Sequence, residues 1–277
     1  MILYLQEIAI VYPRVGVPGA SLSPFVNIDA TTVAGIQRAS ALGFADSGLG
    51  DTVVTPFLYE ANELFTKSAK GRLFTVFRHP IDRAISLFYY LQVADWEPTY
   101  DPALIDWTIE QYAVSDKIEN NWLTRQLSNQ LSGDLEDVHV QKAMEVIRRK
   151  FLVGLMTEME KTMTRLERYF RWTYHVNPEN QEKCRVSLLS GGSNSNSKNK
   201  PKKSKPKEGD EAWELLAAQN QFDLQVWGYI ESLFAEQEQY VADIPEDMRN
   251  VGGTCCKCSP PTIPPEGFEC PAAITEE

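Results

Sequence analysis

The sequence predicts an α/β fold in which a parallel sheet is flanked by helices, with a helix-rich C-terminal half. Two apolar runs of strand length, Leu73–Phe77 and Phe151–Leu155, are each followed by a segment with helical periodicity. A shorter run, Thr52–Thr55 (TVVT), predicts a further buried strand. Strands that alternate with helices indicate a parallel sheet, because a parallel strand pair needs a long crossover connection.

Composition excludes several classes of protein. The chain has 277 residues and is 43% hydrophobic, which is enough for one α/β domain with a real core. Its net charge of −11 argues against non-specific binding to nucleic acid. The three histidines, His79, His139 and His175, are scattered, so no metal-ligand cluster is predicted.

The two ends of the chain predict irregular structure. Residues 1–50 are predicted to be an incomplete N-terminal segment, with loops and a short strand near Ile8–Tyr12. The apolar run Met1–Val11 is too short to span a membrane, and it lacks the basic leader of a signal peptide. Residues 243–277 are predicted to be an irregular tail because proline and glycine are dense there.

Cysteines crowd that tail. Their number is typical of a small disulfide-bonded segment in a secretory or lumenal compartment, and equally of a flexible tail with free thiols or of a chance cluster. The four residues are Cys255, Cys256, Cys258 and Cys270.

Helices are predicted at several places by periodicity and by capping residues. Thr31–Leu42 is the clearest case, with Thr31 or Thr32 as the N-cap and Gly43 as the terminator. Between Trp96 and Asp101 we expect a loop. The other predicted helices are Leu58–Phe65, Ile105–Val114, Ile118–Leu131, Asp134–Arg149, Thr157–Tyr169 and Trp213–Tyr240.

A polar insertion interrupts the C-terminal half. Residues 190–209 contain no hydrophobic residue, and six lysines lie between Lys198 and Lys207. Such a segment cannot form a core, so we predict a disordered surface insertion. The alternative is a mobile basic lid over an anionic ligand, since the lysines are an exception within an acidic protein.

The segment on which the functional prediction depends is Arg72–Tyr90, RLFTVFRHPIDRAISLFYY. The pattern predicts a strand, a turn at Arg78-His79-Pro80, and a helix with Ile81 and Ile85 on its apolar face. Proline is tolerated in the first helical turn because its missing N–H would have no partner there. A guanidinium beside a helix N-terminus is an arrangement that binds phosphate.

This segment resembles the 3′-phosphate-binding segment of the sulfotransferases. It is most similar to the Golgi glycan sulfotransferases, including the heparan sulfate 2-O and 6-O type, which read R-x-P-x-x-R-x-x-S-x-Y/F-Y. Three later segments resemble the family in the same order: residues 119–129 (ENNWLTRQLSN), the strand–helix unit Phe151–Phe170, and residues 222–227 (FDLQVW). The motif itself is carried by Arg78, Pro80, Arg83, Ser86, Phe88 and Tyr89.

The resemblance implies a fold, a reaction and a donor. The fold is a P-loop-like parallel sheet flanked by helices, expected over residues 51–242 with the disordered insertion 190–209. The reaction is transfer of a sulfuryl group from 3′-phosphoadenylyl sulfate to a hydroxyl of a glycan or similar acceptor, without a metal. By resemblance, Arg78 and Ser86 bind the 3′-phosphate, whereas Arg83 has an ion-pair role as its alternative. The family acts in the Golgi lumen, usually from a membrane anchor.

One family motif is missing. A loop of the form PKxGGT/S normally holds the phosphosulfate, and residues 1–77 contain none. The nearest candidate is Tyr12–Ser21 (YPRVGVPGAS), in which Arg14 would replace the lysine. The chain is therefore either an active enzyme or an inactive or truncated sulfotransferase-like binding protein. A different nucleotide or phosphate enzyme is a third alternative, disfavoured because no P-loop or aspartate-rich metal site is visible.

The acceptor side is less defined. Glu60, which follows the predicted strand Thr52–Thr55, is the candidate catalytic base, with a solvated surface glutamate as the alternative. Asn121 and Arg125 lie one helical turn apart and are candidates to line the acceptor groove. Trp96 and Tyr100 either stack on sugar rings or pack in the core. His79 is expected to point away from the donor. The glycan is either anionic, recognised by the lysines, or weakly charged.

Overall fold

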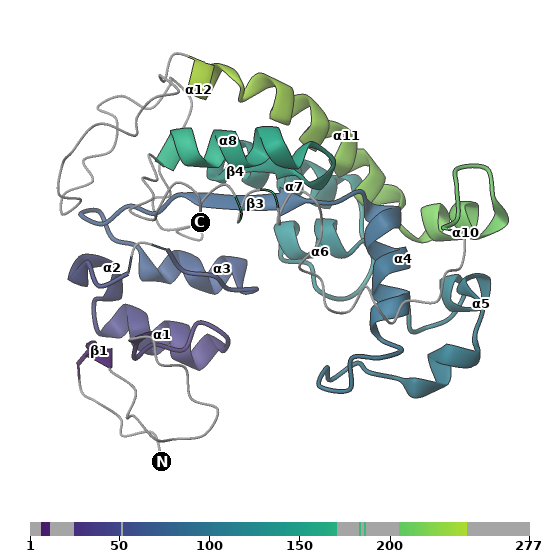
Figure 1. The fold of residues 1–277 in the computed structure, drawn as a ribbon, viewed down its shortest axis with the longest axis horizontal. Coiled ribbons are helices and arrows are strands. Elements are labelled where there is room, and N and C mark those ends of the chain that lie inside the picture. Colours follow the sequence, from purple (N-terminus) through teal and green to yellow (C-terminus); the bar gives the residue numbers. More distant parts are fainter. Residues whose placement is uncertain are drawn as a thin grey trace. The chain divides into compact units, whose positions relative to one another are not determined.

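A computed structural model describes residues 7–11, 25–50, 52–170, 183, 186 and 205–242. The described residues divide into two compact units, one that ends at Leu73 and one that begins at Phe74 (Figure 1). Three predictions lie outside the described residues: the candidate loop Tyr12–Ser21, the cysteine-rich tail 243–277 and the insertion between positions 190 and 204.

The first unit is a small antiparallel strand pair with short helices. Strand β1 (Ile10–Val11) pairs with β2 (Phe25–Val26). The helices are α1 (Val33–Ala41), α2 (Phe44–Ser47) and α3 (Leu58–Ala61), the last followed by the 3₁₀ turn η1 (Asn62–Leu64). They enclose a core of Ile36, Ala39, Phe44 and Leu64.

The predicted caps of α1 are confirmed. The Thr32 hydroxyl accepts a hydrogen bond from the Gly35 amide, which satisfies one of the free donors at the helix start. Gly43 follows the helix with φ of 71°, a left-handed conformation that glycine adopts without strain.

Two predictions in this unit are wrong. Residues 52–55 form no strand, and Val54 is 83% exposed. β-branched residues favour a strand only where a neighbouring strand pairs with them, and the described part of the chain supplies none here. The helix predicted at Leu58–Phe65 is divided into α3 and η1.

The second unit contains the parallel sheet. Strands β3 (Leu73–Phe77) and β4 (Phe151–Leu155) are hydrogen-bonded neighbours and run parallel. The described fold is a mixed α/β structure, mostly helical, in which this two-stranded sheet packs against helices. All five residues of β4 are buried, as its continuous apolar sequence predicts.

A side chain pairs with β4 on the edge that β3 does not use. Gln237 is fully buried; its Oε1 accepts a hydrogen bond from the Val153 amide at 2.8 Å, and its Nε2 donates to the Phe151 carbonyl oxygen at 2.8 Å. These are the two bonds that a third strand would make. Arg165 donates to the Val153 carbonyl, and the Thr162 hydroxyl bonds both the amide and the carbonyl of Leu155. Side chains therefore take the place of a third strand along this edge.

Helices form the rest of the second unit. They are α4 (Pro80–Tyr90), α5 (Ile109–Ala113), α6 (Trp122–Ser128), α7 (Asp137–Lys150), α8 (Met159–Phe170), α10 (Glu211–Gln219), α11 (Gln221–Glu236) and α12 (Gln239–Ala242), with 3₁₀ turns η2 (Pro102–Asp106) and η3 (Met156–Glu158).

The main core joins helices from both halves of the sequence. The buried face of α4 carries Ile81, Ile85 and Phe88, at the predicted helical spacing. It packs with Tyr112 of α5 and Leu216 of α10. This packing brings α10 to the start of α4, which positions the site described next.

Several predicted helices change their bounds. The segment Trp213–Tyr240 is three helices rather than one, because the chain breaks at Asn220 and after Glu236. The helix predicted at Ile118–Leu131 begins only at Trp122. Within the described residues, no helix combines the length and apolarity needed to cross a membrane.

Candidate functional site

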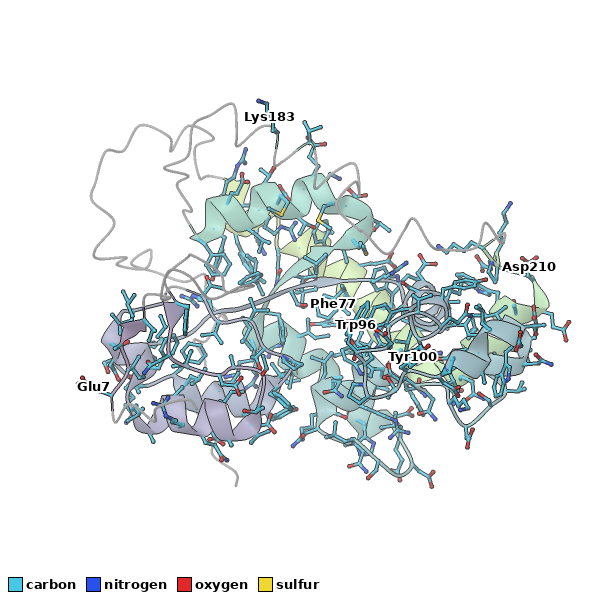
Figure 2. The ribbon with its side chains drawn as sticks, turned by 60° about the horizontal axis from the view of Figure 1, so that its bottom comes forward. Glu7, Phe77, Trp96, Tyr100, Lys183 and Asp210 are labelled. Carbon is cyan, nitrogen blue, oxygen red and sulfur yellow. The ribbon has the colours of Figure 1, made fainter. Side chains whose placement is uncertain are left out.

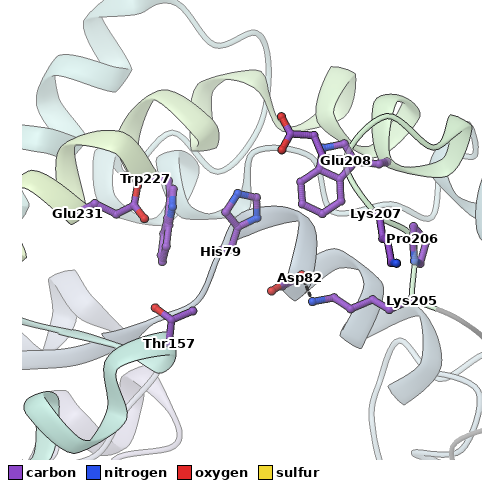
Figure 3. Close-up of a pocket in the computed structure, with 10 residues that line it drawn as sticks. His79, Asp82, Thr157, Lys205, Pro206, Lys207, Glu208, Trp227 and Glu231 are labelled. Carbon is purple, nitrogen blue, oxygen red and sulfur yellow. Dashed lines mark ion pairs between the residues drawn. The ribbon is translucent and has the colours of Figure 1, made fainter.

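A pocket lies at the carboxyl ends of the two parallel strands. His79 follows β3, Thr157 follows β4, and both line a cavity of about 470 Å³ (Figure 3). Open parallel sheets bind ligands at this edge, because the loops after the strands gather there. Residues before and within α10 and α11 complete the wall: Lys205, Pro206, Lys207, Glu208, Trp213, Trp227 and Glu231, together with Asp82 of α4.

The turn between β3 and α4 explains the position of the first pocket residue. Pro80 is the first residue of α4, and His79 stands before it with φ of −51° and ψ of 131°. The His79 carbonyl accepts the Arg83 amide at 2.9 Å, but no side chain of the N-cap bonds the first turn. The helix start therefore presents free amide donors and the positive end of its dipole.

Arg78, the predicted phosphate ligand, is held at this turn. Its side chain is half-buried and makes no hydrogen bond or ion pair with the residues that the structure describes. Burial lowers the pKa of Arg78, and the negative charge of Asp82 opposes that shift. A partly desolvated guanidinium without a bonded carboxylate is suited to an anionic ligand.

Ser86, its predicted partner, lies on α4 and is half-buried. No hydrogen bond of its hydroxyl is seen within the described part of the chain. Arg78 and Ser86 thus belong to one strand–turn–helix unit, as the sequence motif requires. Their binding of a 3′-phosphate stays a prediction.

His79 is packed between two indole rings. Its imidazole stacks on Trp213 at a centroid distance of 5.4 Å and 23°, and meets Trp227 edge-on at 5.4 Å and 71°. Its Nδ1 atom is buried and has no hydrogen-bond partner among the residues that the structure describes. Burial lowers the pKa of His79, although Asp82 and Glu231 oppose the shift, so the ring is neutral at pH 7. The ring lines the pocket, a place that its position in the turn did not predict.

The charges around the pocket are mixed. Lys205 forms an ion pair with Asp82, drawn as a dashed line in Figure 3. Lys207, Glu208 and Glu231 also line the cavity. These residues come from segments far apart in the sequence, so no local pattern could group them; only the lysines were noticed in advance, as a possible lid.

Asn121, predicted to contact the acceptor, is buried, and its side chain caps the start of another helix. Its Oδ1 accepts the Phe222 amide at 2.9 Å and the Asp223 amide at 3.2 Å, at the start of α11. Its backbone is left-handed, with φ of 45°, which asparagine tolerates better than most residues. These contacts give Asn121 a structural role, and its place in an acceptor groove stays a prediction.

Arg125, the second acceptor candidate, forms hydrogen bonds with the residues before and after α6. Its Nε donates to the carbonyl and Oδ1 of Asn120 at 3.2 and 3.0 Å. Its Nη1 donates to the carbonyls of Gln130 and Gly133 at 3.3 and 3.0 Å. Most of its donors are therefore used within the fold, and its contact with an acceptor also stays a prediction.

Arg83 takes the ion-pair role that was its alternative. Its Nη2 lies 2.6 Å from Oε2 of Glu119, and its guanidinium carbon lies 3.9 Å from the ring centroid of Trp122. These two contacts join α4 to the start of α6. Arg78 and Arg83 therefore differ in kind: within the described residues one lacks a bonded partner, whereas the other is fully engaged.

The remaining predicted residues lie elsewhere. Glu60 is a half-buried residue of α3 in the first unit, and the strand expected to precede it is absent from the described residues. Trp96 is 63% exposed, so its core alternative is wrong, and its Nε1 donates to the Tyr90 hydroxyl at 3.1 Å. Figure 2 shows Trp96 and Tyr100 in the loop after α4. The proposed roles of Glu60 and these aromatics stay predictions.

Comparison of the chain with family models, with curated proteins and with solved structures gives no match. Within the described residues, no group of three or more histidine, cysteine, aspartate or glutamate side chains is placed to hold a metal ion. The functional argument therefore depends on the motif and on the geometry of the β3–α4 turn.

Proposed function

We propose that this chain binds 3′-phosphoadenylyl sulfate and transfers its sulfuryl group to a hydroxyl of a glycan. One observation carries the proposal. Arg78 is a half-buried guanidinium without a bonded partner among the described residues, at the uncapped start of α4 and at the carboxyl edge of a parallel strand pair. The sequence motif assigns this same residue to the 3′-phosphate.

The chemistry of sulfuryl transfer assigns a role to each of these side chains. The acceptor oxygen attacks sulfur, the bond between sulfur and the bridging phosphate oxygen breaks, and 3′,5′-bisphosphoadenosine leaves with both electrons. Arg78 donates charge-assisted hydrogen bonds to the 3′-phosphate, and Ser86 adds a neutral donor. The proton of the acceptor hydroxyl passes to a general base.

Local positive charge supports an anionic donor. The chain is acidic, with a net charge of −11, yet Lys205 and Lys207 line the pocket beside the start of α4. The carboxylates of Asp82, Glu208 and Glu231 line the same pocket, so the positive charge offered to a donor is that of the two lysines, of Arg78 in the adjacent β3–α4 turn and of the N-terminus of α4. The donor, a Golgi location and a glycan acceptor follow from the motif and are part of the proposal.

Calorimetry with 3′,5′-bisphosphoadenosine tests the donor site without requiring turnover. A bidentate guanidinium–phosphate contact contributes about 1.5–3 kcal/mol, so Arg78→Ala should weaken binding by roughly tenfold or more. Ser86→Ala should have a smaller effect. The matched control is Arg148→Ala, because Arg148 is an exposed arginine paired with Glu145 on α7. Equal affinity of the Arg78 variant and the natural protein would remove the site assignment.

A second function is favoured by one sequence feature. Residues 1–77 contain no PKxGGT/S loop, which suits a protein that binds the nucleotide without transferring sulfate. Transfer of radiolabelled sulfate from the donor to heparan, chondroitin and neutral oligosaccharides separates the two. Transfer that Arg78→Ala abolishes supports the enzyme, and nucleotide binding without transfer to any of these acceptors supports the binding protein. Magnesium-dependent binding of ATP in place of the bisphosphate would favour the third alternative, a different nucleotide enzyme.

A further inference from the structure

Lys205 reaches the first turn of α4 from the segment that precedes α10. Its ammonium group pairs with the Asp82 carboxylate, while Pro206 and Lys207 continue the pocket wall (Figure 3). The Lys205 side chain is 55% exposed and the Asp82 side chain 23% exposed. An ion pair at such a surface contributes little to stability and is open to competition by dissolved anions.

The other end of this segment is held in a different way. The Lys207 amide donates to Oδ2 of Asp210 at 2.8 Å, and the Asp210 amide donates to the Lys207 carbonyl at 3.0 Å. Asp210 precedes α10, whose Trp213 stacks on His79. The Lys207 ammonium group takes no part in these two bonds, which use its backbone amide and carbonyl. A dissolved anion that binds an ammonium group therefore leaves this turn intact.

Asp82 is the common counter-charge of the site. Besides its pair with Lys205, its negative charge raises the pKa of both Arg78 and His79 against the effect of burial. The carboxylate therefore occupies the electrostatic position that a ligand phosphate would take. The pocket lining also carries the carboxylates of Glu208 and Glu231 and the ammonium group of Lys207, but Asp82 is the carboxylate that Lys205 contacts.

We propose that Asp82 is an internal counter-anion that holds Lys205 at the pocket wall and releases it to the ligand. When an anionic ligand binds, Lys205 exchanges the Asp82 carboxylate for the ligand phosphate, while the turn at Asp210 keeps Lys207 in place. The exchange rests on the proposed function, because it takes the bound anion to be the nucleotide donor. In this exchange the Asp82 carboxylate competes with the ligand for Lys205 and lowers the affinity of the site for anions. Only an anion that binds the ammonium group more tightly than a carboxylate does can displace it.

A double-mutant cycle tests the exchange. Calorimetry with 3′,5′-bisphosphoadenosine compares the natural protein, Asp82→Asn, Lys205→Met and the double variant. Asp82→Asn should tighten binding by roughly threefold or more, because the competing carboxylate is neutralised. The gain should shrink in the Lys205→Met background, where no ammonium is released. Asp106→Asn is the control, since it makes the same change of net charge at an exposed position in η2. An equal gain in both backgrounds, or no gain, overturns the exchange.

A second measurement needs no ligand. Trypsin binds several residues on both sides of the bond it cleaves, so Lys205 must leave Asp82 before the Lys207–Glu208 bond can be cut. The cleavage rate, measured by mass spectrometry, therefore reports how firmly Lys205 anchors the segment. Asp82→Asn and Lys205→Met should both raise the cleavage rate by about threefold or more, because each breaks the same pair, and Asp106→Asn should not. Unchanged rates overturn the anchor. Absence of nucleotide binding in every protein would instead refute the proposed donor site, and the cleavage rates would still decide whether Asp82 holds Lys205.

Discussion

Asn121 and Asp223 cap each other's helices. Asn121 precedes α6 and accepts the amides at the start of α11, while Asp223 on α11 accepts the amides of Leu123 and Thr124 at the start of α6, at 2.9 and 2.7 Å. The Thr124 hydroxyl also donates to Asp223 at 2.7 Å. Two helix starts separated by about a hundred residues in the chain are thereby held together by two side chains.

Removal of the Asp223 carboxylate should destabilise the second unit. Asp223→Ala leaves the buried amide and hydroxyl of Thr124 and the half-buried amide of Leu123 without an acceptor, so we expect the free energy of unfolding to fall by about 2–4 kcal/mol. Asp223→Asn keeps one acceptor oxygen and should lose less. Urea unfolding measures the change, with Asp106→Ala as the exposed control. A loss no larger than that of the control would show that the reciprocal caps contribute little.

His79 should titrate below its ordinary range. Burial lowers the pKa of His79, so NMR titration should place it under the unperturbed value of about 6.5. Trp213→Ala uncovers one face of the ring and should bring the pKa back toward that value. A pKa at or above the ordinary value in the natural protein would contradict the packing between the two indoles.

The same shift gives a sign for stability against pH. The folded protein binds the His79 proton less tightly than the unfolded chain does. The free energy of unfolding is therefore unaffected by this proton above the pKa of the unfolded chain, and it falls as the pH drops through that pKa toward the lower pKa of the folded protein. Urea unfolding at pH 7.5 and pH 5.5 should therefore show a larger loss in the natural protein than in His79→Gln. Equal losses would mean that His79 is not the residue responsible.

Substitution of Gln237, which bonds the edge of β4, should destabilise the second unit. Gln237→Leu keeps the volume but leaves the Val153 amide and the Phe151 carbonyl unsatisfied in the core, at a cost of about 2–4 kcal/mol. Gln225→Leu, an exposed position on α11, is the matched control. Thermal and urea unfolding measure both variants, and similar stabilities would show that solvent replaces the side chain at this edge.

Substitution of Arg83 should lower the stability of the protein, whereas substitution of Arg78 should lower its affinity for the nucleotide. Arg83→Ala breaks the pair with Glu119 and the contact with Trp122, so we expect a loss of about 1–2 kcal/mol in the free energy of unfolding. Its affinity for 3′,5′-bisphosphoadenosine should change by less than about twofold, in contrast to Arg78→Ala. Weaker nucleotide binding by a folded Arg83 variant would show that Arg83 also contributes to donor binding.

The sequence predicted well where a few neighbouring residues decide the outcome. The strand, turn and helix at Arg72–Tyr90 were predicted from local pattern, and the same is true of β4 and of the Thr32 cap. Predictions failed where a distant partner decides. The run Thr52–Thr55 has the composition of a strand but no described neighbour to pair with, and the break at Asn220 lies inside an uninterrupted helical pattern.

The candidate site shows the same division. The sequence by itself determined that Arg78 stands at a helix start after a strand, because backbone geometry there depends on Pro80 and on adjacent apolar residues. Only the tertiary structure decided that His79 lies between Trp213 and Trp227, and that Lys205 meets Asp82. Hydrogen bonds and ion pairs between residues far apart in the chain leave no periodic signal, because packing, not local pattern, brings such residues together.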